Sequence, residues 1–207
     1  MNRHYRNPSP HHSGEDDIPT RVGLDIAQNA VESAKRKRTT CVIAGGLAMH
    51  LYGFVRSTTD VDVVTGAEIP LAGKIKKLSF GGFCYEMPHP TWGYVKLDVI
   101  TRDDPLEKLY AMAAKHPRLI RTKLGMMPVA APEYLAVMKY LAARGKDNND
   151  FVYLATTRGL LNRVKVFDIV RRSFTKEFAW DLNQRINKDI LVARFLKAQE
   201  VPMYEDL

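Results

Sequence analysis

The sequence predicts an α/β (α+β) fold, in which a small mixed β-sheet flanked by helices is followed by a helical C-terminal lobe. Two observations predict it. Short apolar runs typical of strands alternate with helical patterns up to about residue 130, and beyond Pro132 only helical patterns remain. With 45% hydrophobic and 26% charged residues, the composition is that of an ordinary globular chain.

The first half is expected to mix helices and strands. Apolar residues recur every four positions from Val22 to Ala34, which predicts an amphipathic helix that closes at the basic run 35–38. Asp103-Asp104-Pro105 is expected to cap and start a later helix, and the His116-Pro117 pair is expected to stop it. The remaining expectations are strands at 40–44, 59–65 and 94–101, helices at 47–52, 68–78 and 103–116, and a β-hairpin over 118–129.

The second half is expected to be helical, over residues 132–144, 147–158, 160–172 and 176–197. In the second of these helices Asp147 is the expected N-cap. A soft boundary near residue 130 then divides a domain at 20–130 from a helical lobe at 131–207. The polar segment 1–19, with three prolines and three histidines, predicts a disordered tail.

No membrane segment is expected. No apolar run approaches the roughly 18 residues that a membrane helix needs. The first residues lack the apolar core of a secretory signal. The two cysteines, Cys41 and Cys84, lie in apolar stretches and indicate buried free thiols. These features predict a cytoplasmic protein with no membrane partner.

A pair of glycines ends the first predicted strand. Gly45 and Gly46 stand where this strand gives way to a helix. Without a Cβ the backbone N–H groups can approach an anion closely, and a helix N-terminus favours negative charge. The pair therefore predicts a phosphate-binding turn, although a simple tight turn uses the same residues.

Three aspartates on predicted strands form the second feature. Asp60 and Asp62 are two apart, so both side chains point to the same face of their strand. Adjacent carboxylates repel unless a cation lies between them, and hard oxygen ligands suit Mg²⁺ or Mn²⁺ bound together with phosphates. Asp98 lies in an otherwise apolar strand. If the two strands are neighbours, the three carboxylates predict a two-metal site; surface positions are the alternative.

The order of these features resembles the nucleotidyltransferase superfamily, whose fold is that of the DNA polymerase β palm. Gly45, Gly46, Asp60, Asp62 and Asp98 match its motif in order. Gly46 departs from the common Gly-Ser form and cannot offer a hydroxyl to the phosphates. The resemblance implies transfer of a nucleoside monophosphate from an NTP to an acceptor hydroxyl.

A closer resemblance covers roughly residues 40–160 and is to the AbiEii-type abortive-infection toxin nucleotidyltransferases. Arg56-Ser-Thr-Thr-Asp60 leads into the acidic strand, and a helix after Pro132 carries Lys139 before the run Arg144-Gly-Lys-Asp-Asn-Asn-Asp. The resemblance implies a toxin with an antitoxin partner and a tRNA acceptor. It also implies nucleotide-binding roles for Arg56, Thr58, Lys139 and Asp150.

Lys139 stands out without the resemblance. It lies on the same stripe of its helix as Leu135 and Ala142, where a charge must reach water or meet an anion. We therefore expect Lys139 to point into the nucleotide cleft.

The basic charge lies in the second half of the chain. Residues 115–207 hold seventeen Lys and Arg against ten Asp and Glu, which is +7 of the total +8. Such a lobe favours a polyanionic acceptor such as RNA, with Lys165 and Arg172 as the expected contacts at the cleft. Two alternatives stay open. They are a nucleotidyltransferase acting on a small molecule or a protein, and a non-catalytic nucleotide-binding protein of the same fold.

Overall fold

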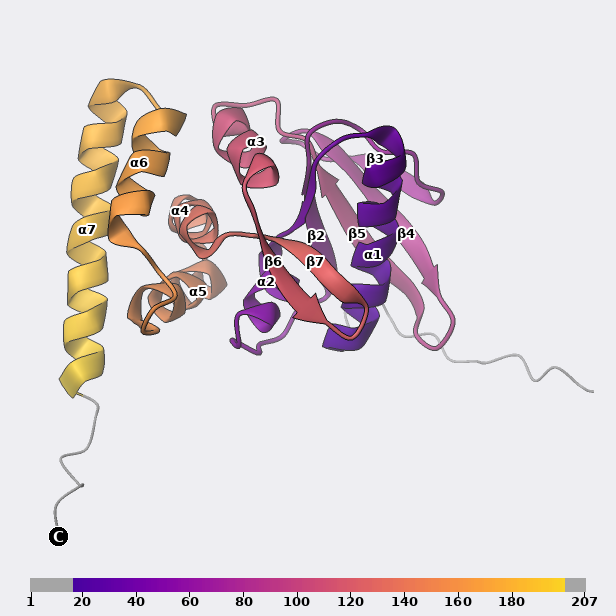
Figure 1. Ribbon diagram of the computed structural model, residues 1–207, viewed down its shortest axis with the longest axis horizontal. Coiled ribbons are helices and arrows are strands. Elements are labelled where there is room, and N and C mark those ends of the chain that lie inside the picture. The colour runs from indigo at the N-terminus through magenta and orange to yellow at the C-terminus, as the bar shows by residue number, and fades with distance from the viewer. Residues whose placement is uncertain (1–16, 200–207) are drawn as a thin grey trace, which may run out of the picture.

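The computed structural model describes residues 17–199, except for the side chain of Lys74 (Figure 1). Within this range the chain forms a mixed sheet with helices around it and a helical C-terminal portion, which confirms the predicted fold class. The strands are β1 (Cys41–Ile43), β2 (Asp60–Thr65), β3 (Lys74–Lys77), β4 (Gly82–His89), β5 (Gly93–Ile100), β6 (Pro117–Thr122) and β7 (Gly125–Ala130). The helices are α1 (Thr20–Lys37), α2 (Gly45–Leu51), α3 (Glu107–Lys115), α4 (Pro132–Ala142), α5 (Gly145–Thr156), α6 (Arg163–Ser173) and α7 (Lys176–Gln199).

The strand order in the sheet is β3-β4-β5-β2-β1-β7-β6. Two of the pairings are parallel, β2 with β5 and β1 with β7, and the other four are antiparallel. The parallel pairing of β2 with β5 has a direct consequence for function. It places Asp62 directly beside Asp98, because these two residues are Cα partners in the register.

The helix expected over residues 68–78 is wrong. Pro70 and Gly73 interrupt any helix there, and residues 74–77 instead form the edge strand β3. This strand pairs with β4, which the sequence reading did not anticipate. β4 in turn pairs with β5 along its whole length, from Gly82 opposite Ile100 to His89 opposite Gly93.

Two other expectations concern element ends. Residues 1–16 of the expected tail lie outside the described residues. Of the three that follow, Ile18 is buried, and its N–H donates to the carbonyl oxygen of Thr58 at 2.8 Å. The assignment of Asp147 as an N-cap is wrong, because α5 begins at Gly145 and Asp147 lies inside its first turn.

Helices α4 to α7 stack at one end of the molecule, beyond the sheet (Figure 1). α4 is the central one, because it contacts α3, α5 and α6. Its residues from Pro132 to Lys139 are all buried. A polar side chain on this helix therefore has to find its partners inside the protein.

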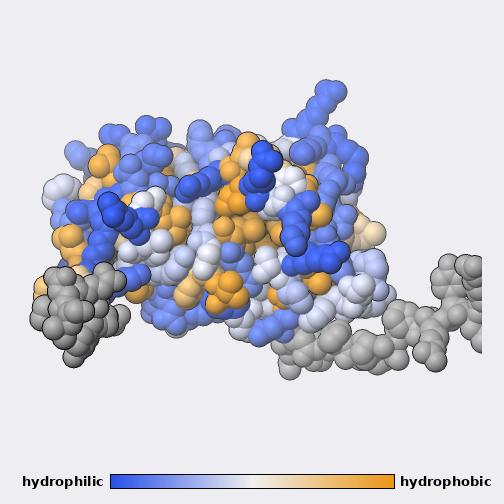
Figure 2. Space-filling view, turned by 60° about the horizontal axis from the view of Figure 1, so that its bottom comes forward, coloured by the Kyte–Doolittle hydropathy of each residue, from blue (hydrophilic) through white to orange (hydrophobic). Residues whose placement is uncertain are grey.

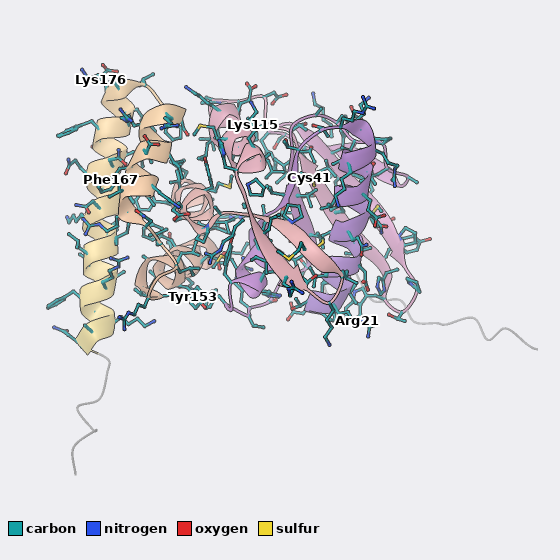
Figure 3. All side chains as sticks on the ribbon, viewed as in Figure 1. Arg21, Cys41, Lys115, Tyr153, Phe167 and Lys176 are labelled. Carbon is teal, nitrogen blue, oxygen red and sulfur yellow. The ribbon has the colours of Figure 1, made fainter. Side chains whose placement is uncertain are left out.

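The face shown in Figure 2 is largely hydrophilic, with hydrophobic side chains exposed between the charged ones. Cys41, labelled in Figure 3, and Cys84 are both buried free thiols, as predicted. Burial raises the pKa of each thiol to about 12, so neither is an activated nucleophile. No helix in the part of the chain that the structure describes is long and apolar enough to span a membrane.

Candidate active site

The three predicted aspartates line one cleft of about 300 Å³. Asp60 and Asp62 come from β2, and Asp98 comes from the neighbouring strand β5. Burial, together with the negative charges of Asp60 and Asp98, raises the pKa of Asp62 to about 7. Burial is also the first cause that raises the pKa of Asp98, and the charge of Asp60 adds to it. The cleft thus concentrates negative charge that the protein leaves largely uncompensated.

The two glycines lie against these carboxylates at the start of α2. Gly45 has a φ of +57°, and a Cβ on it would lie only 1.8 Å from Asp62 Oδ2. A Cβ on Gly46 would lie 2.4 Å from Thr58 Oγ1 and 3.3 Å from Arg56 Nη1. Both positions therefore require glycine here, and the turn brings the backbone of α2 against Asp62, Thr58 and Arg56.

Thr58 explains why the serine of the common motif form is missing. Its Oγ1 fills the space beside Gly46 that a side chain at that position would need. Thr58 lines the cleft and is 8% exposed. The cleft therefore keeps a hydroxyl next to the glycine turn, although it comes from the segment before β2.

We expect Gly46→Ser to destabilise the fold by about 1–3 kcal/mol, because the new side chain would overlap Thr58. Adding Thr58→Gly should recover much of the loss, since it removes both the Oγ1 and the Cβ of Thr58, which would lie 2.4 and 2.8 Å from the new Cβ, while the serine returns one hydroxyl to the turn. Urea unfolding of the two single variants and the double variant measures this coupling. Strictly additive losses would contradict the proposed overlap.

A buried ion-pair cluster forms the wall of the cleft next to the glycine turn. Arg56 donates from Nε and Nη2 to the two carboxylate oxygens of Asp150, at 2.7 and 2.8 Å. Lys139 Nζ lies 2.9 Å from Asp147 Oδ1 and 2.8 Å from Asp150 Oδ2. Arg144 completes the cluster by donating to Asp147. We call these five residues the ion cluster.

The two aspartates of the ion cluster are fully buried. Burial alone would raise the pKa of Asp147, but hydrogen bonds from Arg144 and Lys139 lower it below its usual value. Asp150 does not line the cleft, whereas Arg56, Lys139 and Arg144 do. Asp150 thus lies behind the wall and holds two cleft-lining cations in place.

Comparison with solved structures identifies the fold. An antigenic nucleotidyltransferase-like protein from Paracoccidioides brasiliensis matches with a TM-score of 0.54 and 14% sequence identity, over 86% of this chain and 94% of that one. The chain has the nucleotidyltransferase fold. The antibiotic-resistance factor ANT(2'')-Ia matches with a TM-score of 0.36 and 14% identity, over 87% and 98% of the two chains. Neither a protein-family model nor a curated protein sequence matches this chain.

On this nucleotidyltransferase fold, every metal-binding or nucleotide-binding residue proposed from the sequence except Asp150 lines the same cleft. The closer resemblance to AbiEii-type toxins stays a prediction. From the sequence, no role was assigned to several other residues of the cleft, among them Arg144, which precedes α5, and Lys146, the second residue of that helix. Other cleft residues without a predicted role are Phe80, Ile100, Arg102 and Tyr110.

Arg102 organises the end of the cleft beyond Asp98. Its guanidinium carbon lies 4.8 Å from the ring centre of Phe80 and 4.6 Å from that of Tyr110. Two of its nitrogens donate to the carboxylate of Asp104. This end of the cleft is therefore aromatic, and its guanidinium charge is paired within the protein. Arg102 follows Asp98 by four residues along the same segment of the chain, and this spacing is the sequence signal from which it could have been predicted.

The basic pair expected at the cleft does not lie there. Lys165 lines a separate groove of about 1120 Å³ between the start of β6, α4 and α6. Arg172 pairs with Asp168 on its own helix at 2.7 Å, and neither basic residue lines the cleft. The sequence placed Lys165 and Arg172 on one helix face, but it did not determine which groove that face borders.

Proposed function

We propose that the protein transfers a nucleoside monophosphate from an NTP to an acceptor hydroxyl in a metal-dependent reaction and releases pyrophosphate. The observation that supports this most strongly is the convergence of Asp60, Asp62 and Asp98 on one cleft beside the glycine turn. Three carboxylates without enough cations of their own are suited to bind divalent cations together with a polyphosphate.

The donor set fits Mg²⁺ or Mn²⁺. All three residues supply carboxylate oxygens, and the pKa of Asp62 is raised first by burial and then by the negative charges of Asp60 and Asp98, both of which a bound cation would offset. Within residues 17–199 no three acidic, histidine or cysteine side chains are already arranged as a metal-ligand group, so binding requires the carboxylates to reorient. When bound, the metal would supply charge stabilisation to the phosphates and lower the pKa of the acceptor hydroxyl.

Residues of the chain would then bind the triphosphate, take the proton of the acceptor and exclude water. The glycine turn and Thr58 would hold the triphosphate. The acceptor oxygen would attack the α-phosphorus, the bond from that phosphorus to the bridging oxygen of pyrophosphate would break, and the carboxylate of Asp98 would take the proton of the acceptor hydroxyl. The aromatic end around Arg102 would exclude water from the side of the cleft beyond Asp98.

For the acceptor we propose a nucleic acid, with tRNA as the first choice. The support is the charge of +7 in residues 115–207 and the two exposed cations, Arg144 and Lys146, that line the cleft. A protein or small-molecule acceptor is the alternative.

Incubation of the protein with each of the four α-labelled NTPs, Mg²⁺ and total RNA tests both parts. Label in RNA supports the whole proposal, and a loss of this labelling as salt rises would fit phosphate contacts. Label in a protein band or a small molecule, with the RNA unlabelled, would support the proposed nucleotidyl transfer but exclude a nucleic acid as its acceptor. If no NTP gives a labelled product, although a known nucleotidyltransferase is active in the same mixture, the proposed reaction is contradicted.

A further inference from the structure

The cations of the cleft differ in how much of their charge is already engaged. Arg56 and Lys139 are paired with the buried aspartates of the ion cluster, and Arg102 is paired with Asp104. Arg144 is paired with Asp147. Lys146 is the remaining cation of the cleft lining, and no carboxylate in residues 17–199 forms an ion pair with it.

Lys139 is poorly placed to exchange partners. Its side chain is 8% exposed, and the two carboxylates that it contacts are fully buried. Turning Lys139 toward a phosphate would leave these buried carboxylates short of positive charge, and an unpaired buried ion is strongly destabilising. The structure therefore makes Lys139 an internal partner, in contrast to the role that the resemblance implies.

Lys146 is placed to meet a substrate. It is exposed, and it is the second residue of α5. Asp150, the sixth residue of α5, accepts from Arg56, whose Nη1 would lie 3.3 Å from a Cβ placed on Gly46. Lys146 also lines the same cleft as Asp60, Asp62 and Asp98.

We propose that Lys146 binds the β- or γ-phosphate of the nucleotide, and that Lys139 is a positioning residue that holds Asp147 and Asp150. This assignment rests on the proposed function and adds to it the residue that recognises the leaving group. A phosphate would replace only water around the Lys146 ammonium, so the protein need not break an internal pair to make the contact.

Binding measurements without turnover test the assignment. The full chain is titrated calorimetrically in Ca²⁺ with each of the four NTPs, and then with the monophosphate of the base that binds most tightly. We expect Lys146→Met to weaken NTP binding about tenfold, because it removes one charge-assisted hydrogen bond. Monophosphate binding should change by less than about twofold, since the contact is to the phosphates that the monophosphate lacks.

Two variants sharpen the comparison. Lys146→Arg keeps the charge and should retain most of the NTP affinity. Lys165→Met removes a lysine from the separate groove and should leave both affinities unchanged.

The outcomes separate the assignment from the function on which it rests. Wild-type protein that binds no NTP would overturn both. NTP binding that Lys146→Met does not weaken would overturn the assignment alone. An equal loss for NTP and monophosphate would also overturn it, because the contact would then lie at the α-phosphate or act through the fold.

Discussion

Asp62→Asn is expected to abolish nucleotidyl transfer and at the same time to raise the melting temperature. Activity should fall by roughly 10³-fold or more, because the variant lacks one of the carboxylates that bind the divalent cation. Stability should rise because Asp62 is buried beside Asp60 and Asp98, and removing its charge relieves their repulsion. A gain of about 1 kcal/mol corresponds to about 2–4 °C in a chain of this length.

Labelled transfer and thermal unfolding in EDTA measure the two effects on the same preparation. The matched control is Asp181→Asn on α7, where the carboxylate is exposed and pairs with Arg185 at the surface. It should leave both activity and melting temperature nearly unchanged. Full activity in Asp62→Asn, or a lower melting temperature than the wild type, would show that this carboxylate is not held against its neighbours for metal binding.

Asp150→Ala is expected to be the most destabilising single substitution in the cleft wall. The variant would leave Arg56 and Lys139 without the buried carboxylate that both contact. Breaking a buried ion pair in this way costs about 3–5 kcal/mol, and the melting temperature should fall by on the order of 10 °C. NTP binding should weaken as well, because Arg56 would lose the bidentate contact that orients it.

Asp168→Ala is the appropriate control for this variant. Asp168 also accepts from two arginines, Arg171 and Arg172, but all three side chains are on the surface of α6. Chemical denaturation of both variants should therefore show a large loss for Asp150→Ala and almost none for Asp168→Ala. Equal losses of stability in the two variants would mean that the burial of the ion cluster contributes nothing to the stability of the fold.

The sequence predicts those parts of the site that depend on the spacing of residues close together in the chain. The two-residue separation of Asp60 and Asp62 determines their shared face, and the glycine pair determines the tight backbone start of α2. The position of Asp98 beside Asp62 needed one further fact, the parallel pairing of β2 with β5. From the sequence alone, this pairing could be given only as a condition for the three-carboxylate site.

The ion cluster was beyond the reach of sequence reasoning. Arg56 and Asp150 are 94 positions apart, and no local period relates them. Lys139 on an apolar stripe was a correct signal of a buried charge, but its partner was expected to be substrate rather than Asp147 and Asp150. For β3 the signal was present in the alternation Lys-Ile-Lys-Lys, and the helical reading of residues 68–78 overlooked Pro70 and Gly73.

The ion cluster also bears on how the chain can be cut. Arg56 comes from the sheet half, whereas Lys139, Asp147 and Asp150 come from α4 and α5, after the boundary expected near residue 130. A fragment ending at Ala130 would retain every strand but would leave the Arg56 guanidinium without its counter-ion and the cleft without one wall. We therefore expect the two halves to unfold together as one cooperative unit, and insertion or truncation between β7 and α4 to separate charges that the intact chain pairs.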